Sequence, residues 1–150
     1  MKDHARLAHE NFKRGYNCAQ AVAIAFADEM GMSETELAKL ASSFGGGMGK
    51  MREVCGAVSG ALLVYGALRG NSDPEDGEAK KQHYARVQEF AARFKAEHET
   101  IICRELLKNI ALKKDAGGDP EERTPEYYRT RPCVRFVETA ATILAQMLAE

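Results

Sequence analysis

The chain has little of what would direct it to a charged partner or into a membrane. Its 21 basic and 22 acidic residues give a net charge of −1 and are spread along the whole length. This balance offers no electrostatic attraction to nucleic acid or to an anionic membrane surface. The apolar run at residues 54–68 carries no charge, but it is shorter than the roughly 18 residues that indicate a membrane span. The sequence therefore predicts no nucleic-acid partner and no membrane-spanning segment.

Two further features are missing. No apolar segment follows the polar N-terminus, so we expect no signal peptide and a cytoplasmic location. No two cysteines have Cys-x-x-Cys spacing, since Cys18, Cys55, Cys103 and Cys133 lie 37, 48 and 30 positions apart. These gaps exclude a local thioredoxin-type motif and the usual zinc-knuckle pattern. Any site that uses the four cysteines must be assembled by the fold.

No alternating strand pattern is present, and nearly every segment has helical periodicity. Capping boxes are expected at Asn17 with Gln20 and at Ser33 with Glu36. At 150 residues, with no repeat or linker, the chain is expected to form one all-α domain over residues 1–150, a bundle of about six or seven helices. The expected helices cover 2–14, 17–31, 33 to the glycine-rich stretch, 50–68, 74 to before 100, 101–114, and 132 onwards. Asp73 and Thr100 are expected caps, and 115–131 is an expected loop.

A glycine-rich stretch stands at the centre of the sequence. Gly45, Gly46, Gly47 and Gly49 predict a loop with backbone conformations that other residues avoid. The phosphate-loop pattern is absent, because Phe44 and Met51 occupy two of its required positions. In the apolar helix that follows, Gly56 and Gly60 share one face. Glycine in a helix costs about 1 kcal/mol relative to alanine, so this pair predicts a neighbour pressed against the backbone there.

All four cysteines are expected near helix starts, where the dipole stabilises a thiolate and lowers its pKa. Structural disulfides are rare in the cytoplasm, so four cysteines indicate redox or metal chemistry, with inert buried thiols as the alternative. Short connections between antiparallel helices should bring the cysteines to one end of the bundle. At least one pair should lie within the reach of a disulfide, about 7 Å between Cα atoms, and the expected pairing is Cys18–Cys55 and Cys103–Cys133.

Other residues near the cysteines give weaker indications. Five arginines lie within four positions of a cysteine: Arg14, Arg52, Arg104, Arg131 and Arg135. With 21 basic residues in 150, about one is expected by chance in any eight-residue flank, so these arginines carry no argument. The four histidines lack ligand spacing. Tyr127 and Tyr128 either shield a site or only pack.

The sequence Cys55-Gly56-Ala57-Val58-Ser59-Gly60 resembles the Cys-Gly-Ala-x-x-Gly signature of the C_GCAxxG_C_C family of putative redox-active proteins. One cysteine precedes the signature, within Gly-Tyr-Asn-Cys-Ala-Gln, and two follow it, as in that family; the glycine-rich lead-in is similar too. The resemblance covers the chain from about Tyr16 to the C-terminus. It implies a small single domain called redox-active for its cysteines, in a family often encoded near transporter genes, with no firmly attached substrate.

We therefore expect thiol–disulfide chemistry with an unidentified thiol substrate or redox partner, with Cys18, Cys55, Cys103 and Cys133 as the reacting residues and Cys55 as the best nucleophile. The six glycines named above are expected to support the site. One alternative is a zinc or iron–sulfur site with the same four cysteines as ligands. Another is a regulatory partner of a transporter that carries out no chemistry.

Overall fold

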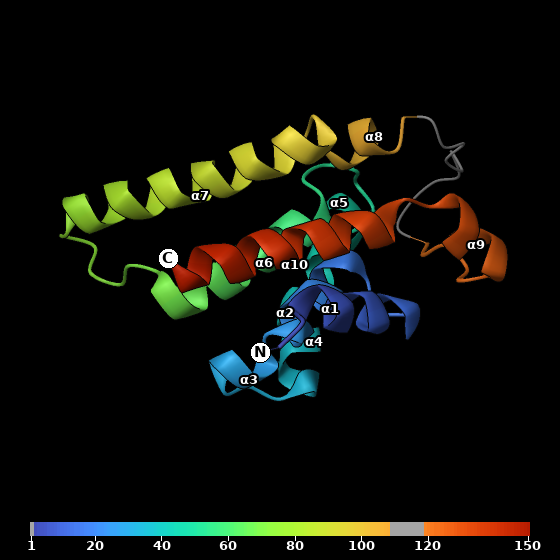
Figure 1. Cartoon of the computed structure of the whole chain (residues 1–150), viewed down its shortest axis with the longest axis horizontal. Coiled ribbons are helices and arrows are strands. Elements are labelled where there is room, and N and C mark those ends of the chain that lie inside the picture. Colours follow the sequence, from blue (N-terminus) through green and yellow to red (C-terminus); the bar gives the residue numbers. More distant parts are fainter. Residues whose placement is uncertain (1, 109–118) are drawn as a thin grey trace.

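The computed structural model describes residues 2–108 and 119–150, which form a bundle of α-helices (Figure 1). Its six longer helices are α1 (His4–Lys13), α2 (Cys18–Ala25), α4 (Glu34–Ala41), α6 (Gly56–Arg69), α7 (Gly77–His98) and α10 (Cys133–Ala149). Between them lie α3 (Ala27–Met30), the 3-10 turn η1 (Ser42–Phe44), α5 (Gly45–Met48), α8 (Cys103–Leu106) and α9 (Pro125–Thr130). These ranges contain no strand, only an isolated bridge between Val54 and Ile102. The predicted all-α bundle is confirmed.

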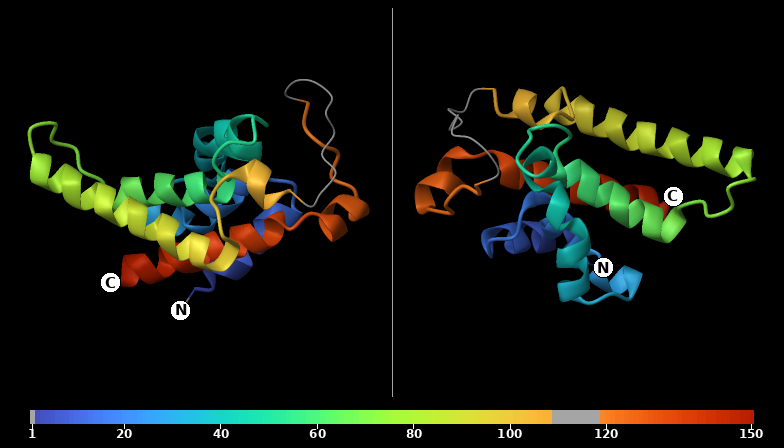
Figure 2. Two further views of the ribbon diagram at one scale, coloured as in Figure 1. Left: turned by 90° about the horizontal axis from the view of Figure 1, so that it is seen from above. Right: turned by 180° about the vertical axis from the view of Figure 1, so that it is seen from behind.

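The core lies where α2, α6 and α10 meet. Helix α2 packs between α1 and α6 (Figure 2). Helix α10 packs against α1, α2 and α6, and α7 packs against α10. The core side chains with almost no exposure include Val22 of α2, Val58 and Val64 of α6, and Leu144 of α10. Helix α7 contributes little except near its C-terminal end, because its buried residues are Phe90 and Phe94. No helix in the described ranges is both long and apolar enough to cross a bilayer.

The two predicted capping boxes are confirmed. The Asn17 side chain accepts from the Gln20 backbone amide at 2.8 Å, and the Gln20 side chain accepts from the Asn17 amide at 3.0 Å. Ser33 and Glu36 form the same reciprocal pair. The helix expected over 17–31 is broken at Phe26, and its second part, α3, ends at Gly31 with a left-handed φ of 63°.

Several predicted boundaries were wrong. Helix α6 begins at Gly56, six residues after the expected start at position 50. Asp76, not Asp73, caps α7 through the Ala79 amide. The expected loop 115–131 contains α9, which Thr124 caps.

The helix expected from 101 to 114 is short where the structure describes it. Helix α8 runs only from Cys103 to Leu106, and Ile102, not Thr100, stands at its N-cap. Thr100 accepts a hydrogen bond from the Ile102 amide, which supports the turn before the helix. The part of the prediction at 109–118 lies outside the described residues.

The glycine-rich stretch forms a left-handed turn. Five successive residues, 46–50, have φ between 56° and 71°. The residues that follow the turn form hydrogen bonds back to it. The Arg52 amide donates to the Gly46 carbonyl, and the Glu53 amide donates to the Gly47 carbonyl. A Cβ on Gly47 would lie 2.6 Å from the Glu53 nitrogen, so no other residue fits there. This closed turn explains why α6 begins later than predicted, since residues 50–54 follow the turn instead of a helix.

The predicted close approach at Gly56 and Gly60 is confirmed. A Cβ on Gly60 would lie 2.5 Å from the Ala19 carbonyl oxygen, and one on Gly56 would lie 2.9 Å from the Phe44 oxygen. Both glycines thus let α2 and η1 pack directly on the backbone of α6. The start of α2, which carries Cys18, is held against the start of α6 in this way.

Candidate functional site: a four-thiol cavity and its basic vestibule

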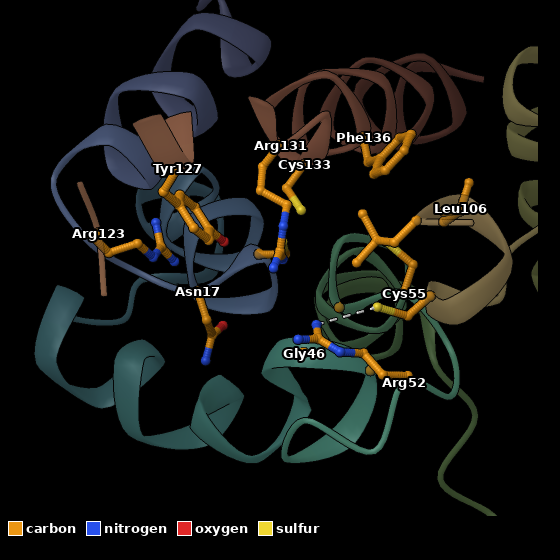
Figure 3. Close-up of a pocket in the computed structure, with 15 residues that line it drawn as sticks. Asn17, Gly46, Arg52, Cys55, Leu106, Arg123, Tyr127, Arg131, Cys133 and Phe136 are labelled. Carbon is orange, nitrogen blue, oxygen red and sulfur yellow. Dashed lines mark hydrogen bonds between the residues drawn. The ribbon is translucent and has the colours of Figure 1, made fainter. Parts of the chain in front are cut away.

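The structure brings all four cysteines around one cavity of about 50 Å³ (Figure 3). We call it the thiol cavity; besides the cysteines, its lining includes Gly46, Gly47, Arg52, Tyr127 and Arg131. Cys18, Cys103 and Cys133 are the first residues of α2, α8 and α10, and Cys55 is the N-cap of α6. The volume is enough for about one or two water molecules. The thiols therefore have room for a single reacting atom or a small group between them.

Backbone pairing places Cys55 beside Cys103, although 48 positions separate them in the sequence. The Cys55 amide donates to the Ile101 carbonyl at 2.8 Å, and the Cys103 amide donates to the Glu53 carbonyl at 2.6 Å. These bonds flank the Val54–Ile102 bridge. The starts of α6 and α8 are thus held together independently of side-chain packing.

Cys18 and Cys133 are two thiols whose ionisation is linked. Cys133 and burial together raise the pKa of Cys18 well above its ordinary value. Cys18 and the charge of Arg131 lower the pKa of Cys133 to about 7 against the opposing effect of burial. These opposite shifts favour a protonated Cys18 and an ionised Cys133. All four thiols are free in the structure, so neither expected pair, Cys18–Cys55 or Cys103–Cys133, is joined by a disulfide.

Two arginines and one glutamate set the charge around the thiols. Arg131 is only 6 % exposed and pairs with Glu121, whose other oxygen accepts from Arg52 at 3.0 Å. Arg52 also approaches the Cys103 sulfur at 3.9 Å. Burial opposes ionisation of Glu121, but the two arginines hold its pKa below the usual value. Arg52 and Arg131, which the sequence argument had set aside, both line the cavity; Arg52 approaches Cys103 and not its sequence neighbour Cys55.

Burial argues against the expectation that Cys55 is the best nucleophile. Its side chain is 3 % exposed, and burial raises its pKa to about 12, although the backbone amides at the start of α6 oppose this shift. The pKa of Cys103 is likewise raised by burial, which outweighs the opposing effect of Arg52. A helix start alone does not make a thiolate when the sulfur has lost its contact with water. Cys133 differs because Cys18 and the Arg131 guanidinium both favour its thiolate.

A second, larger hollow of about 270 Å³ borders the thiol cavity. We call it the basic vestibule, because its charged lining residues are Lys50, Arg52, Arg123, Arg131 and a single carboxylate, Glu121. Tyr127 lines both spaces, and burial raises its pKa. The sequence left open whether Tyr127 and Tyr128 shield a site or only pack. Tyr127 lines the site. Tyr128 packs edge-on against Phe12.

The predicted glycines lie where the two spaces meet. Gly46 and Gly47 line the thiol cavity, as does Gly56, while Gly45, Gly46 and Gly49 line the vestibule. Gly60 lies behind this region, against Ala19.

The cysteines do not form a preformed metal centre in this arrangement. Within residues 2–108 and 119–150, no three histidine, cysteine or acidic side chains are placed to hold one metal ion. All four cysteines belong to these ranges, and tetrahedral zinc requires its ligands at about 2.0–2.3 Å. A four-thiolate zinc site would therefore need a rearrangement of the thiols.

Sequence reasoning missed Glu121 and Arg123, both in the segment expected to be an open loop. Arg123 donates to the carbonyl oxygens of Phe12 and Tyr16, which fixes this segment to the N-terminal helices. Nothing local in the sequence signals the two Arg123 contacts, because Phe12 and Tyr16 are more than 100 positions away from Arg123.

No protein of curated function and no solved structure gives a significant match to the chain. Residues 16–147 match the sequence profile described as "Putative redox-active protein (C_GCAxxG_C_C)". The cavity geometry places all four cysteines of that pattern around one space. The match spans most of the chain, and the protein therefore belongs to the C_GCAxxG_C_C family.

Proposed function

We propose that the protein is a dithiol oxidoreductase in which Cys133 is the nucleophile and Cys18 the resolving thiol. The observation that carries this proposal is that Cys18 and Cys133 line the same small cavity, together with the buried Arg131. Arg131 and Cys18 both lower the pKa of Cys133. A thiolate attacks a disulfide sulfur, and the nucleophile works best when its pKa is near the ambient pH. Cys133 meets this condition at neutral pH.

The reaction is two-step thiol–disulfide exchange. The Cys133 thiolate attacks one sulfur of a substrate disulfide, so a mixed disulfide forms and one substrate thiolate leaves. The Cys18 sulfur then attacks Cys133, its proton passes to the second leaving thiolate, and a Cys18–Cys133 disulfide forms. The protein loses two electrons, and the substrate gains them as two thiols. Cys55 and Cys103 line the same cavity and stay protonated, because burial favours their neutral thiol forms.

The test is oxidation with hydroxyethyl disulfide, which is neutral and small, followed by blocking of free thiols and peptide mapping without reduction. We expect a Cys18–Cys133 cross-link in the wild type and in Cys55→Ser, and none in Cys133→Ser. Recovery of both Cys18 and Cys133 as free thiols after oxidation would overturn the assignment. Metal analysis of anaerobically purified protein addresses the alternative, since one bound zinc or iron centre per chain with four protected thiols would replace this proposal. Association with a transporter, which the family resemblance implies, stays a prediction.

A further inference from the structure

The vestibule concentrates positive charge in a protein whose net charge is −1. Four cationic side chains and one carboxylate line it, which leaves three positive charges in excess. Glu121 offsets part of the charge of Arg52 and Arg131. The other two cations have no carboxylate partner among the described contacts: Lys50 donates to the Asp119 carbonyl at 2.5 Å, and Arg123 donates to carbonyl and hydroxyl oxygens. The vestibule is thus electrostatically matched to an anion.

The two spaces differ in size in a way that orients a ligand. The thiol cavity, at about 50 Å³, admits no more than the reacting atoms. The vestibule, at about 270 Å³, is large enough for a small organic group. Arg52, Arg123, Tyr127 and Arg131 line both spaces, so a ligand that enters the vestibule lies next to the thiols. A substrate must therefore place its scissile bond at the narrow end and its charge at the wide end.

Taking these observations together, we infer that the substrate is a low-molecular-weight disulfide that carries carboxylate groups. This inference rests on the proposed function and adds the substrate class to it. The carboxylates lie in the vestibule near Lys50 and Arg123, while one sulfur reaches Cys133. Attack by Cys133 releases one carboxylate-bearing thiolate, and closure of the Cys18–Cys133 disulfide releases the second as a thiol. No further oxidant or reductant is required for this half-reaction.

The test compares three aliphatic disulfides of similar size: dithiodipropionate, which is dianionic, hydroxyethyl disulfide, which is neutral, and cystamine, which is dicationic. The rate of Cys18–Cys133 disulfide formation is measured for each and divided by its rate with dithiothreitol, which removes differences in intrinsic reactivity. We expect the dianion to react about tenfold faster than the neutral disulfide, the low end of electrostatic steering. This preference should shrink as salt is raised from 0.01 to about 0.15 M, because screening shortens the reach of the charges.

Lys50→Gln tests the vestibule itself. Lys50 lines the vestibule but not the thiol cavity, and its partner is a neutral carbonyl, so the substitution leaves no charge unpaired. We expect the dianion rate to fall about threefold while the neutral disulfide keeps its rate. Lys95→Gln on α7 removes the same charge outside both spaces and should change neither rate.

The outcomes separate the two proposals. If the neutral disulfide forms the cross-link and all three react within a factor of two, the anionic substrate is overturned and the proposed dithiol function stands. The anionic substrate is overturned in the same way if Lys50→Gln slows every disulfide equally. If no disulfide forms the Cys18–Cys133 cross-link, both proposals are overturned.

Discussion

Replacing Gly60 by alanine should destabilise the protein, against the usual trend for a helix. The added Cβ would lie 2.5 Å from the Ala19 oxygen and 2.8 Å from the Ala19 Cα, where ordinary contact begins at about 3.4 Å. Both atoms are backbone, and α2 has α1 and α10 packed on its other sides, so α2 cannot move away freely. Overpacking of this kind costs about 1–3 kcal/mol. Because the distances are so short, the overpacking cost of Gly60→Ala should lie near the upper end of this range. The better helix propensity of alanine offsets about 1 kcal/mol of that cost.

The expected net loss in the free energy of unfolding is therefore about 2 kcal/mol. Gly66→Ala in the same helix is the matched control, because nothing lies within 4 Å of its added Cβ. That variant should gain up to about 1 kcal/mol. Urea unfolding of both variants measures the difference, and thermal melting should show a loss of about 4–8 °C for Gly60→Ala. If Gly60→Ala is as stable as Gly66→Ala, the direct packing of α2 on the α6 backbone is refuted.

Three further predictions concern the thiol cavity and the glycine turn. Alkylation of Cys133 should reach half its maximal rate near pH 7, since its pKa is lowered, and Cys18→Ala should move that midpoint upward; peptide-resolved iodoacetamide labelling checks both, and an unmoved midpoint contradicts the influence of Cys18 on the Cys133 thiolate. Glu121→Gln should move the Cys133 midpoint downward, because its two arginine partners are no longer neutralised, whereas an unchanged pH profile would show that Glu121 does not moderate the thiolate. Gly47→Ala should lower the melting temperature more than Gly49→Ala: both have positive φ, but only the first adds a clash with backbone, so equal losses would argue against that clash.

Features set by neighbouring residues could be predicted from the sequence. The capping boxes at Asn17 and Ser33 depend on a side chain and an amide three positions apart, and both form. The close packing at Gly56 and Gly60 of α6 was predicted correctly, because glycine inside a helix indicates that a neighbouring element approaches the backbone. The gathering of the cysteines around one cavity was also predicted, from short connections between successive helices.

The chemistry of the individual thiols could not be predicted in the same way. A thiol pKa depends on burial and on which charges face it, and both are set by residues distant in sequence. Cys55 and Cys133 both stand at helix starts, yet their pKa values are shifted in opposite directions. Arg131 is two positions from Cys133, but its relevance depends on a side-chain direction that sequence proximity does not reveal. Glu121 enters the site through a segment whose local sequence suggested only a loop.

The backbone bridge between Val54 and Ile102 has a consequence for how the chain tolerates changes in length. Between these two points the chain leaves the thiols along α6, turns, and returns along α7, whose first half projects from the bundle (Figure 1). Because the bridge fixes the beginning and the end of this excursion, its outer turn at residues 70–77 can be lengthened or shortened without altering the register of Cys55 against Cys103. That turn is exposed and far from both spaces of the site. It is therefore the place where a tag, a fluorescent reporter or an inserted domain can be accommodated while the thiol geometry is preserved.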